Sequence, residues 1–240
     1  MTIWVIRART LVAWAALMAF TVGVGVYWHA ERAQSAFSAW DSAHTLVLDA
    51  GHGGFDGGAI GASGTTEQHI NLSVVKRTEA LAGLFGIETA LTRQDEQALD
   101  YQAGRAVREN KVADIKARER ITKEAQSPIF LSVHLNKFED GKYKGAQTFY
   151  SKNNPAGKPL AESLQRCLID GLAPDNHRQA KQAVDTIYLM KKLDCPAVIV
   201  ECGFLSNLEE EALLQREEYH KRLAVCIVSG YLQFLRGDMA

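Results

Sequence analysis

The stretch Asp49-Ala50-Gly51-His52-Gly53-Gly54 joins an apolar, β-branched run to a glycine-rich turn that carries a histidine. Two later stretches have the same character, Ser132-Val133-His134-Leu135-Asn136 and Val200-Glu201-Cys202-Gly203-Phe204. In an α/β sheet, ligand and catalytic groups gather just beyond the carboxyl ends of the strands. The sequence therefore predicts that two histidines and one glutamate converge on a single crevice, which is the geometry of a hydrolytic metal site.

Outward from these stretches, apolar segments alternate with segments of helical periodicity. This alternation is typical of an α/β fold with a mostly parallel sheet. We expect a six-stranded sheet flanked by helices, in one catalytic domain at 45–237, and a polar surface loop at 94–112. The expected strands lie at 45–50, 87–92, 129–135, 146–150, 186–190 and 197–202, and the expected helices at 71–85, 113–125, 157–172 and 217–235.

The N-terminus differs in character from the rest of the chain. Arg7 and Arg9 precede an uncharged run, Leu11 to Trp28. About 18 residues are at the lower limit for crossing a bilayer and exceed the ~7–15 residues usual for the core of a signal peptide. Residues 1–29 are therefore expected to form a cytoplasmic stub and a membrane anchor, and 30–44 a linker. Cleavage after Ala33-Gln34-Ser35 is the alternative. By the positive-inside rule, the rest of the chain is exported and lies at the extracytoplasmic face of the membrane.

Charge and cysteine content exclude some classes of function. The chain has 27 basic and 28 acidic residues, so no strong positive field indicates a nucleic-acid partner. Cys195 and Cys202 flank one expected strand, about 23 Å apart at ~3.3 Å per residue, which is too far for a disulfide. A Cys167–Cys226 bridge stays open as an alternative, but we expect small, buried, unpaired side chains.

His52 and His134 are the expected metal ligands. Two imidazoles and one carboxylate form a common catalytic zinc set that leaves the fourth position open. Glu67, between the glycine-rich loop and the following helix, is the preferred third ligand, with Asp56 as its main competitor and His69 as a minor alternative. The expected cofactor is one zinc ion.

Glu201 is the expected catalytic residue. An unpaired carboxylate buried in an apolar strand costs several kcal/mol, so this residue needs a polar partner such as a metal and its water. From that position it would deprotonate the attacking water and then protonate the leaving amine.

Two other catalytic arrangements are disfavoured. No Gly-x-Ser-x-Gly turn follows a strand, which argues against a serine nucleophile. Acidic neighbours would raise the pKa of Cys202 and weaken it as a nucleophile. We expect His69, His177 and His220 to be solvated.

The combined motifs closely resemble the zinc-dependent N-acetylmuramoyl-L-alanine amidases of the amidase-3 family, over residues 45–235. The resemblance implies that His52, Glu67 and His134 hold zinc, that Glu201 is catalytic, and that the substrate is the amide between N-acetylmuramic acid and L-alanine in peptidoglycan. Asn136, Arg93 and Arg118 also match family positions and would support the site or orient substrate.

Finer motifs resemble one subgroup, the germination-specific, CwlD-type amidases of endospore-forming bacteria. They are Gly145 to Tyr150, Arg178 to Lys181 and Ile187 to Met190. The resemblance implies removal of stem peptides from spore cortex before muramic-δ-lactam forms, in the space between forespore and mother-cell membranes. An activating protein partner is compatible with this interpretation. The alternatives are a vegetative wall amidase in cell separation and a non-catalytic peptidoglycan-binding protein.

Overall fold

The computed structural model describes Trp14, residues 17–27 and residues 44–237, which fall into two separate units. Residues 17–27 are helical. Among the residues with described positions, no helix is both long and apolar enough to cross a membrane. Most of the expected linker at 30–44, and parts of the uncharged run, lie outside the described residues. The anchor and its cleavage therefore stay predictions.

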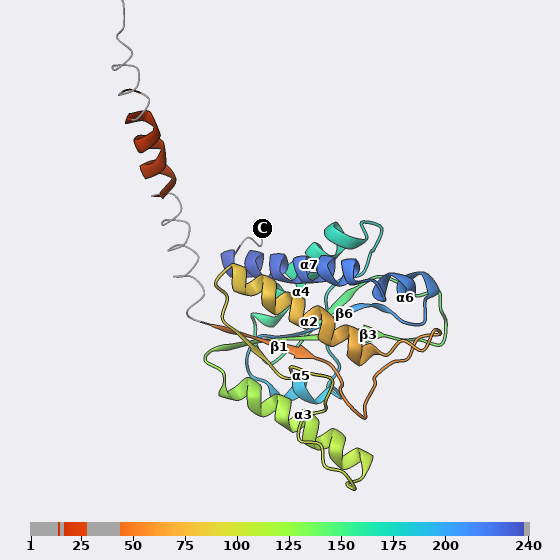
Figure 1. The fold of residues 1–240 in the computed structure, drawn as a ribbon. Helices are drawn as coiled ribbons and strands as arrows, with labels where there is room; N and C mark the ends of the chain where they lie inside the picture. The colour runs from red at the N-terminus through yellow and green to blue at the C-terminus, as the bar shows by residue number, and fades with distance from the viewer. Residues whose placement is uncertain (1–13, 15–16, 28–43, 238–240) are drawn as a thin grey trace, which may run out of the picture. The chain divides into compact units, whose positions relative to one another are not determined.

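The second unit is built on one six-stranded sheet with the order β2-β1-β3-β6-β4-β5 (Figure 1). Every pairing is parallel except that of β4 with β6. The predicted α/β class and mostly parallel sheet are confirmed. The strands are β1 (Thr45–Ala50), β2 (Thr89–Leu91), β3 (Pro128–Asn136), β4 (Gln147–Tyr150), β5 (Lys181–Gln182) and β6 (Ala197–Phe204).

Helices cover both faces of the sheet (Figure 1). On one face lie α2 (Glu67–Leu84), α4 (Gly157–Leu172) and α7 (Glu217–Arg236), which pack with the larger of two apolar clusters. On the other face lie α3 (Val107–Glu124) and α5 (Tyr188–Lys192). Alternate residues of β1 serve the two layers, since Leu46 and Leu48 belong to the first cluster and Val47 to the second.

The strand register determines where polar groups meet. Asp49 pairs with Ser132 between β1 and β3, and His134 pairs with Glu201 between β3 and β6. The chain leaves β1 toward β2 on one side, and β3 lies on the other. This change of direction creates the crevice at the carboxyl ends where ligands bind in such folds.

The expected strand at 186–190 is wrong. Residues Tyr188–Lys192 form the short helix α5, and the sheet edge is taken by Lys181 and Gln182. The apolar run Ile187-Tyr188-Leu189-Met190 favoured a strand, but Leu189 and Met190 are buried against the face of the sheet instead. A short apolar run alone does not distinguish these two ways of burying side chains.

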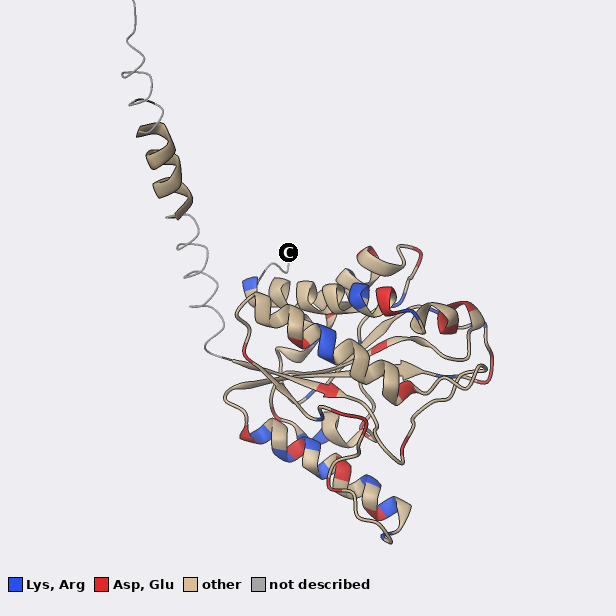
Figure 2. Cartoon of the chain, in the orientation of Figure 1, with Lys and Arg blue, Asp and Glu red and all other residues tan. Residues whose placement is uncertain are grey.

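Two helix starts differ from expectation, and one short helix was not predicted. Helix α3 begins at Val107, inside the expected surface loop. Its buried residues include Asn110, Arg118 and Thr122, and charged residues lie along its length (Figure 2), so the sequence shows no apolar stripe that would mark its start. Helix α2 begins four residues early, at Glu67. The short helix α6 (Leu208–Leu214) was not predicted, although Asn207 caps it by accepting hydrogen bonds from Glu209 and Glu210.

Helices α4 and α7 cross at a glycine, which yields a stability prediction. A Cβ on Gly230 would lie 2.8 Å from Leu164 Cα, so the backbones would have to separate. Gly230→Ala is expected to lower the free energy of unfolding by about 1–3 kcal/mol, measured by urea denaturation. Gly83→Ala on α2 is the control, since nothing lies within 4 Å of its Cβ. There, alanine is expected to leave stability unchanged or raise it by up to about 1 kcal/mol. Equal effects of the two substitutions would contradict the close crossing.

Candidate metal centre

His52 lies in a tight turn directly after β1. Its φ of 63° is in the left-handed region, and Gly54 has a φ of 56°. Gly51 leaves room for the other histidine, because a Cβ there would lie 2.3 Å from the His134 ring. The glycines therefore let the backbone of this turn pass directly against the second imidazole.

Three side chains converge at this point. Glu67 Oε1 lies 3.3 Å from His52 Nε2 and 2.9 Å from His134 Nδ1. One donor atom from each residue lies within 4.8 Å of the other two, so the group could hold a metal ion. The two histidines come from the ends of β1 and β3, and Glu67 from the first turn of α2. The structure brings together the three residues that the sequence predicted.

Glu67 is fixed by further hydrogen bonds. The Ala59 amide donates to Oε2 at 2.8 Å, and the Leu135 amide donates to Oε1 at 3.0 Å. Asn71 Nδ2 donates to Oε1 at 3.3 Å. These contacts make Glu67 a rigid, almost fully buried carboxylate rather than a mobile side chain at a helix end.

Asp56, the competing third ligand, lies behind His52. Its Oδ2 is 3.2 Å from His52 Nδ1, and its Oδ1 is 3.1 Å from Lys111 Nζ. This arrangement leaves His52 Nε2 directed toward Glu67 and resembles the carboxylate–histidine pairs that orient metal ligands. His69 is exposed and contacts Glu96 instead, at 2.9 Å.

The electrostatics of the group favour a bound cation. Burial alone would lower the pKa of His52, but the Asp56 and Glu67 carboxylates outweigh burial and raise that pKa to about 9. Burial likewise opposes ionisation of Glu67, yet both histidines hold its pKa well below its ordinary value. The group is thus arranged for positive charge, and its two imidazoles and one carboxylate match a catalytic zinc set.

Glu201 lies on β6, next to His134 on β3. Within the described part of the chain, its Oε2 is buried without a hydrogen-bond partner. Burial raises the pKa of Glu201 to about 7, with the Glu67 carboxylate adding to this effect and the histidines opposing it. A carboxyl group with a pKa near neutrality can both accept and return a proton.

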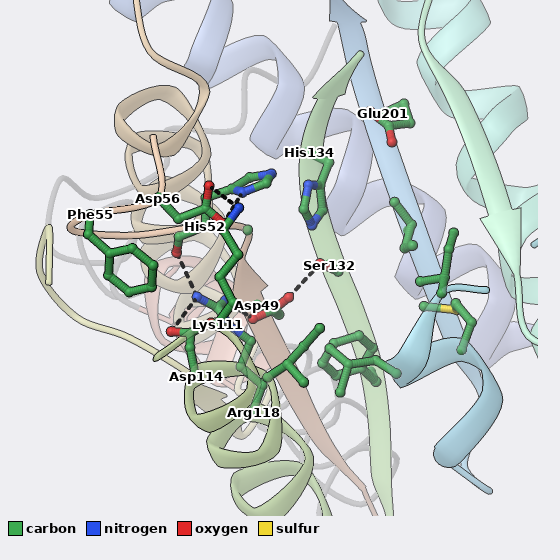
Figure 3. Close-up of a pocket in the computed structure, with 17 residues that line it drawn as sticks. Asp49, His52, Phe55, Asp56, Lys111, Asp114, Arg118, Ser132, His134 and Glu201 are labelled. Carbon is green, nitrogen blue, oxygen red and sulfur yellow. Dashed lines mark hydrogen bonds and ion pairs between the residues drawn. The ribbon is translucent and has the colours of Figure 1, made fainter. Parts of the chain in front are cut away.

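The cavity at this site has a volume of about 340 Å³. Figure 3 shows His52 and His134 on one side of it and Glu201 on the neighbouring strand. Phe55 and Lys111 line its mouth, and an apolar wall extends along the α5 side of the sheet. That wall consists of Phe130, Ile187, Leu189, Met190 and Ile199.

Arg118 and Arg93 hold the turn that carries His52. Arg118 donates to the carbonyls of Ala50 and His52 and pairs with Asp49. Arg93 donates to the carbonyls of Ala50 and Gly51. Two roles were expected for these arginines, to support the site or to orient substrate. Both are buried, so their contacts fit the first role. The side chain of Asn136 accepts a hydrogen bond from the Lys137 amide beyond the end of β3.

Arg118 yields a second stability prediction. Arg118→Met leaves the Asp49 carboxylate buried without its cation, and breaking such a pair costs about 3–5 kcal/mol of unfolding free energy. The control is Arg120→Met on the same helix, whose pair with Asp100 is half exposed and contributes about 0–1 kcal/mol. Urea denaturation at pH 7 measures both. A loss below 1 kcal/mol for Arg118→Met would show that the buried pair does not support the turn.

Several supporting residues were missed by the sequence analysis. Asp49 accepts hydrogen bonds from Thr92 and Ser132. Glu211 of α6 accepts the Ala62 and Ser63 amides of the glycine-rich loop. For Asp49 a signal was present in the sequence, because an aspartate in an otherwise apolar strand needs polar partners. For Glu211 no local pattern indicates a contact with a loop about 150 residues earlier.

The remaining histidine and cysteine predictions have mixed outcomes. The expectation that His220 is solvated is wrong, because it is buried and hydrogen-bonds with Ser73 and the Leu214 carbonyl. All four cysteines are free, so the alternative Cys167–Cys226 bridge is not formed. Burial, followed by the nearby Glu201 charge, raises the pKa of Cys202, as expected for a thiol that is not a nucleophile.

Comparisons with known proteins agree with this geometry. The germination-specific N-acetylmuramoyl-L-alanine amidase of Bacillus subtilis is 30% identical over 82% of this chain and 83% of its own length. The N-acetylmuramoyl-L-alanine amidase LytC of the same organism is also 30% identical, over 80% of this chain and 36% of its own length. The chain thus spans about a third of LytC.

A solved structure shares the fold closely. The CwlD amidase of Clostridioides difficile, determined in complex with the GerS lipoprotein, superposes with a TM-score of 0.76. It is 37% identical and covers 81% of this chain and 99% of that one. Residues 46–233 match the Amidase_3 family, described as N-acetylmuramoyl-L-alanine amidase. The chain therefore belongs to the Amidase_3 family of N-acetylmuramoyl-L-alanine amidases, which are hydrolases that act on peptidoglycan.

Proposed function

We propose that this amidase works with one zinc ion held by His52, Glu67 and His134, and that Glu201 is its general base and acid. The observation that carries the proposal is the buried Glu201 Oε2. It has no hydrogen-bond partner among the described residues, and it lies one strand from the three-residue group. A carboxylate left unpaired in this position is available to a water and a substrate.

In the proposed reaction, Glu201 acts first as a base and then as an acid. Glu201 takes a proton from the attacking water as the water oxygen forms a bond to the lactyl carbonyl carbon. It then returns the proton to the nitrogen of L-alanine as the carbon–nitrogen bond breaks. Zinc, when bound, polarises the carbonyl and acidifies water. Asp56, which lies 3.2 Å from His52 Nδ1, keeps that imidazole oriented throughout.

We further propose a role in spore cortex maturation and germination. The support is the similarity to the germination-specific amidase of B. subtilis and to the CwlD amidase. Release of stem peptides would precede muramic-δ-lactam formation in the space between forespore and mother-cell membranes. Because the CwlD structure contains the GerS lipoprotein, an activating protein partner is part of this proposal.

The location proposed for the enzyme is the extracytoplasmic face of the membrane. Its support is the uncharged run Leu11 to Trp28 after Arg7 and Arg9, since cytoplasmic arginines direct the following chain outward. Protease treatment of intact protoplasts tests this placement in vegetative cells made to express the chain, because no forespore is present there and the extracytoplasmic face is open to the medium. Protection of the catalytic unit from external protease would contradict it.

Mass spectrometry of digested peptidoglycan tests the reaction. The zinc-loaded full-length chain is expected to release stem peptides that begin with L-alanine, while the glycan strands stay intact. Spore cortex from a strain lacking the gene is expected to retain stem peptides and to lack muramic-δ-lactam. Normal lactam content in that strain would contradict the spore role and favour the vegetative alternative.

A further inference from the structure

An exposed aromatic ledge lies at the end of the strand pair that carries His134 and Glu201. It consists of Phe138 and Tyr143, which lie in the loop between β3 and β4 and are 46% and 40% exposed. Their rings pack edge to face at 5.1 Å, and Phe138 lies 5.4 Å from the buried ring of Phe204. Large apolar side chains left exposed as a group in this way usually mark a binding surface.

The ledge is built on the two strands that carry the site. Phe204 lies three residues after Glu201 on β6, and it pairs with Asn136, two residues after His134 on β3. The Leu205 amide donates to the Asn136 carbonyl at 2.9 Å, which closes the end of this strand pair. The ledge is therefore a direct continuation of the catalytic edge of the sheet.

Polar contacts hold the ledge in place. The Phe138 amide donates to Ser206 Oγ at 3.1 Å, and Asn207 Nδ2 donates to the Gly141 carbonyl at 2.8 Å. The Gly145 amide donates to Glu210 Oε1 at 2.8 Å. The exposed rings thus stand on a loop attached at both ends and in its middle.

The Phe204 ring links the ledge to a cation. The Arg178 guanidinium lies 4.6 Å from the centre of that ring. Its other contacts are donated to Gln147 Oε1 and to the Lys144 carbonyl. Phe204 is buried and in contact with Arg178, so the exposed rings Phe138 and Tyr143 are the ones that a ligand can reach. The Lys142 ammonium lies 5.4 Å from the centre of the Tyr143 ring, on a side chain that is itself largely exposed and can move aside.

We propose that this ledge binds a sugar ring of the glycan strand next to the muramic acid whose amide is cut. The inference rests on the proposed function, because the glycan continues on both sides of that muramic acid. A pyranose ring has an apolar face of C–H groups, which packs on the electron-rich face of an aromatic ring. Neutral N-acetylated sugars match exposed rings better than the carboxylates of the stem peptide do.

The test uses two series of substrates, and in each series only the glycan length or only the peptide length varies. One series carries the same stem peptide on one, two or four sugars, and a second carries longer peptides on a fixed glycan. For the zinc-loaded full-length chain in detergent, kcat/KM is expected to rise with glycan length. Phe138→Ala and Tyr143→Ala are each expected to reduce that rise by roughly three- to tenfold, without changing kcat/KM on the single-sugar substrate.

Two variants serve as controls. Phe138→Tyr keeps an aromatic ring and is expected to retain the dependence on glycan length. Leu84→Ala removes an exposed apolar side chain at the end of α2 and is expected to change nothing. The ledge assignment is overturned if the alanine variants lower kcat/KM equally for every glycan, if the loss follows peptide length, or if glycan length has no effect.

A binding measurement separates this inference from the proposed reaction. The full-length Glu201→Gln chain is mixed with glycan strands that have been stripped of peptide, and the bound fraction is measured by cosedimentation. Adding Phe138→Ala is expected to weaken binding by roughly three- to tenfold. Unchanged binding would refute the ledge even if hydrolysis proceeds as proposed, whereas weakened binding would support it even if the zinc mechanism is wrong.

Discussion

Glu201→Gln is expected to lower kcat by about a thousandfold, within the usual 10²–10⁴-fold contribution of a general acid–base group. Glutamine has nearly the same shape but cannot take the proton from water or return it to the leaving nitrogen. Release of stem peptides measured by mass spectrometry gives the rate, and elemental analysis gives the zinc content. Zinc content is expected to stay at one ion per chain.

The same variant has a stability consequence. Burial raises the pKa of Glu201 to about 7, so its folded pKa lies above its unfolded value. Keeping the carboxylate ionised above that pKa costs folding free energy. In the metal-free protein at pH 8, Glu201→Gln is therefore expected to have an equal or higher midpoint of thermal unfolding. Glu209→Gln, at an exposed position, is the control for both measurements. Normal turnover of Glu201→Gln would refute the catalytic assignment.

His134→Ala is expected to abolish stoichiometric zinc binding and hydrolysis together. It removes one of three donors whose atoms lie within 4.8 Å of one another. The two remaining donors are fewer than the three protein ligands of a catalytic zinc site. Competition with a chromophoric chelator measures the affinity without relying on activity. His69→Ala is the control, since His69 is exposed and contacts Glu96 rather than the group.

The choice between Glu67 and Asp56 as third ligand is tested in the same assay. Asp56→Asn removes a partner of His52 and is expected to weaken zinc binding about 10–100-fold. Glu67→Gln removes a donor and is expected to abolish binding. The reverse pattern, with zinc lost in Asp56→Asn and kept in Glu67→Gln, would show that Asp56 is the third ligand.

The sequence predicted the central strands and the residues at their ends because these strands are recognisable as apolar runs. Runs such as Leu46 to Ala50 and Ile129 to Val133 are apolar at every position except one, Asp49 in the first and Ser132 in the second, since a central parallel strand is buried on both faces. Polar residues at the ends of such runs had to gather at one edge. The sequence therefore identified His52, His134 and Glu201 as candidates, whereas Glu67 was preferred over Asp56 by its place before a helix and by the family resemblance.

The tertiary structure decided what periodicity could not show. Helix α3 buries Asn110, Arg118 and Thr122 rather than an apolar stripe, so its start was hidden. Tyr188 to Met190 fall in helix α5, which buries Leu189 and Met190 against the face of the sheet, while β5 forms the sheet edge. The choice between Glu67 and Asp56 as a member of the metal group also depended on contacts across the fold.

By itself, the sequence determined the fold class, the edge of the sheet where polar residues gather, and His52, His134 and Glu201 as candidates for the site, because burial and strand direction are encoded locally. Only the tertiary structure placed Asp56 behind His52, set the buried Arg118 against its turn, and left Phe138 and Tyr143 exposed at the end of the strand pair that carries His134 and Glu201. Those arrangements join residues far apart in the chain, and such contacts depend on how the layers pack.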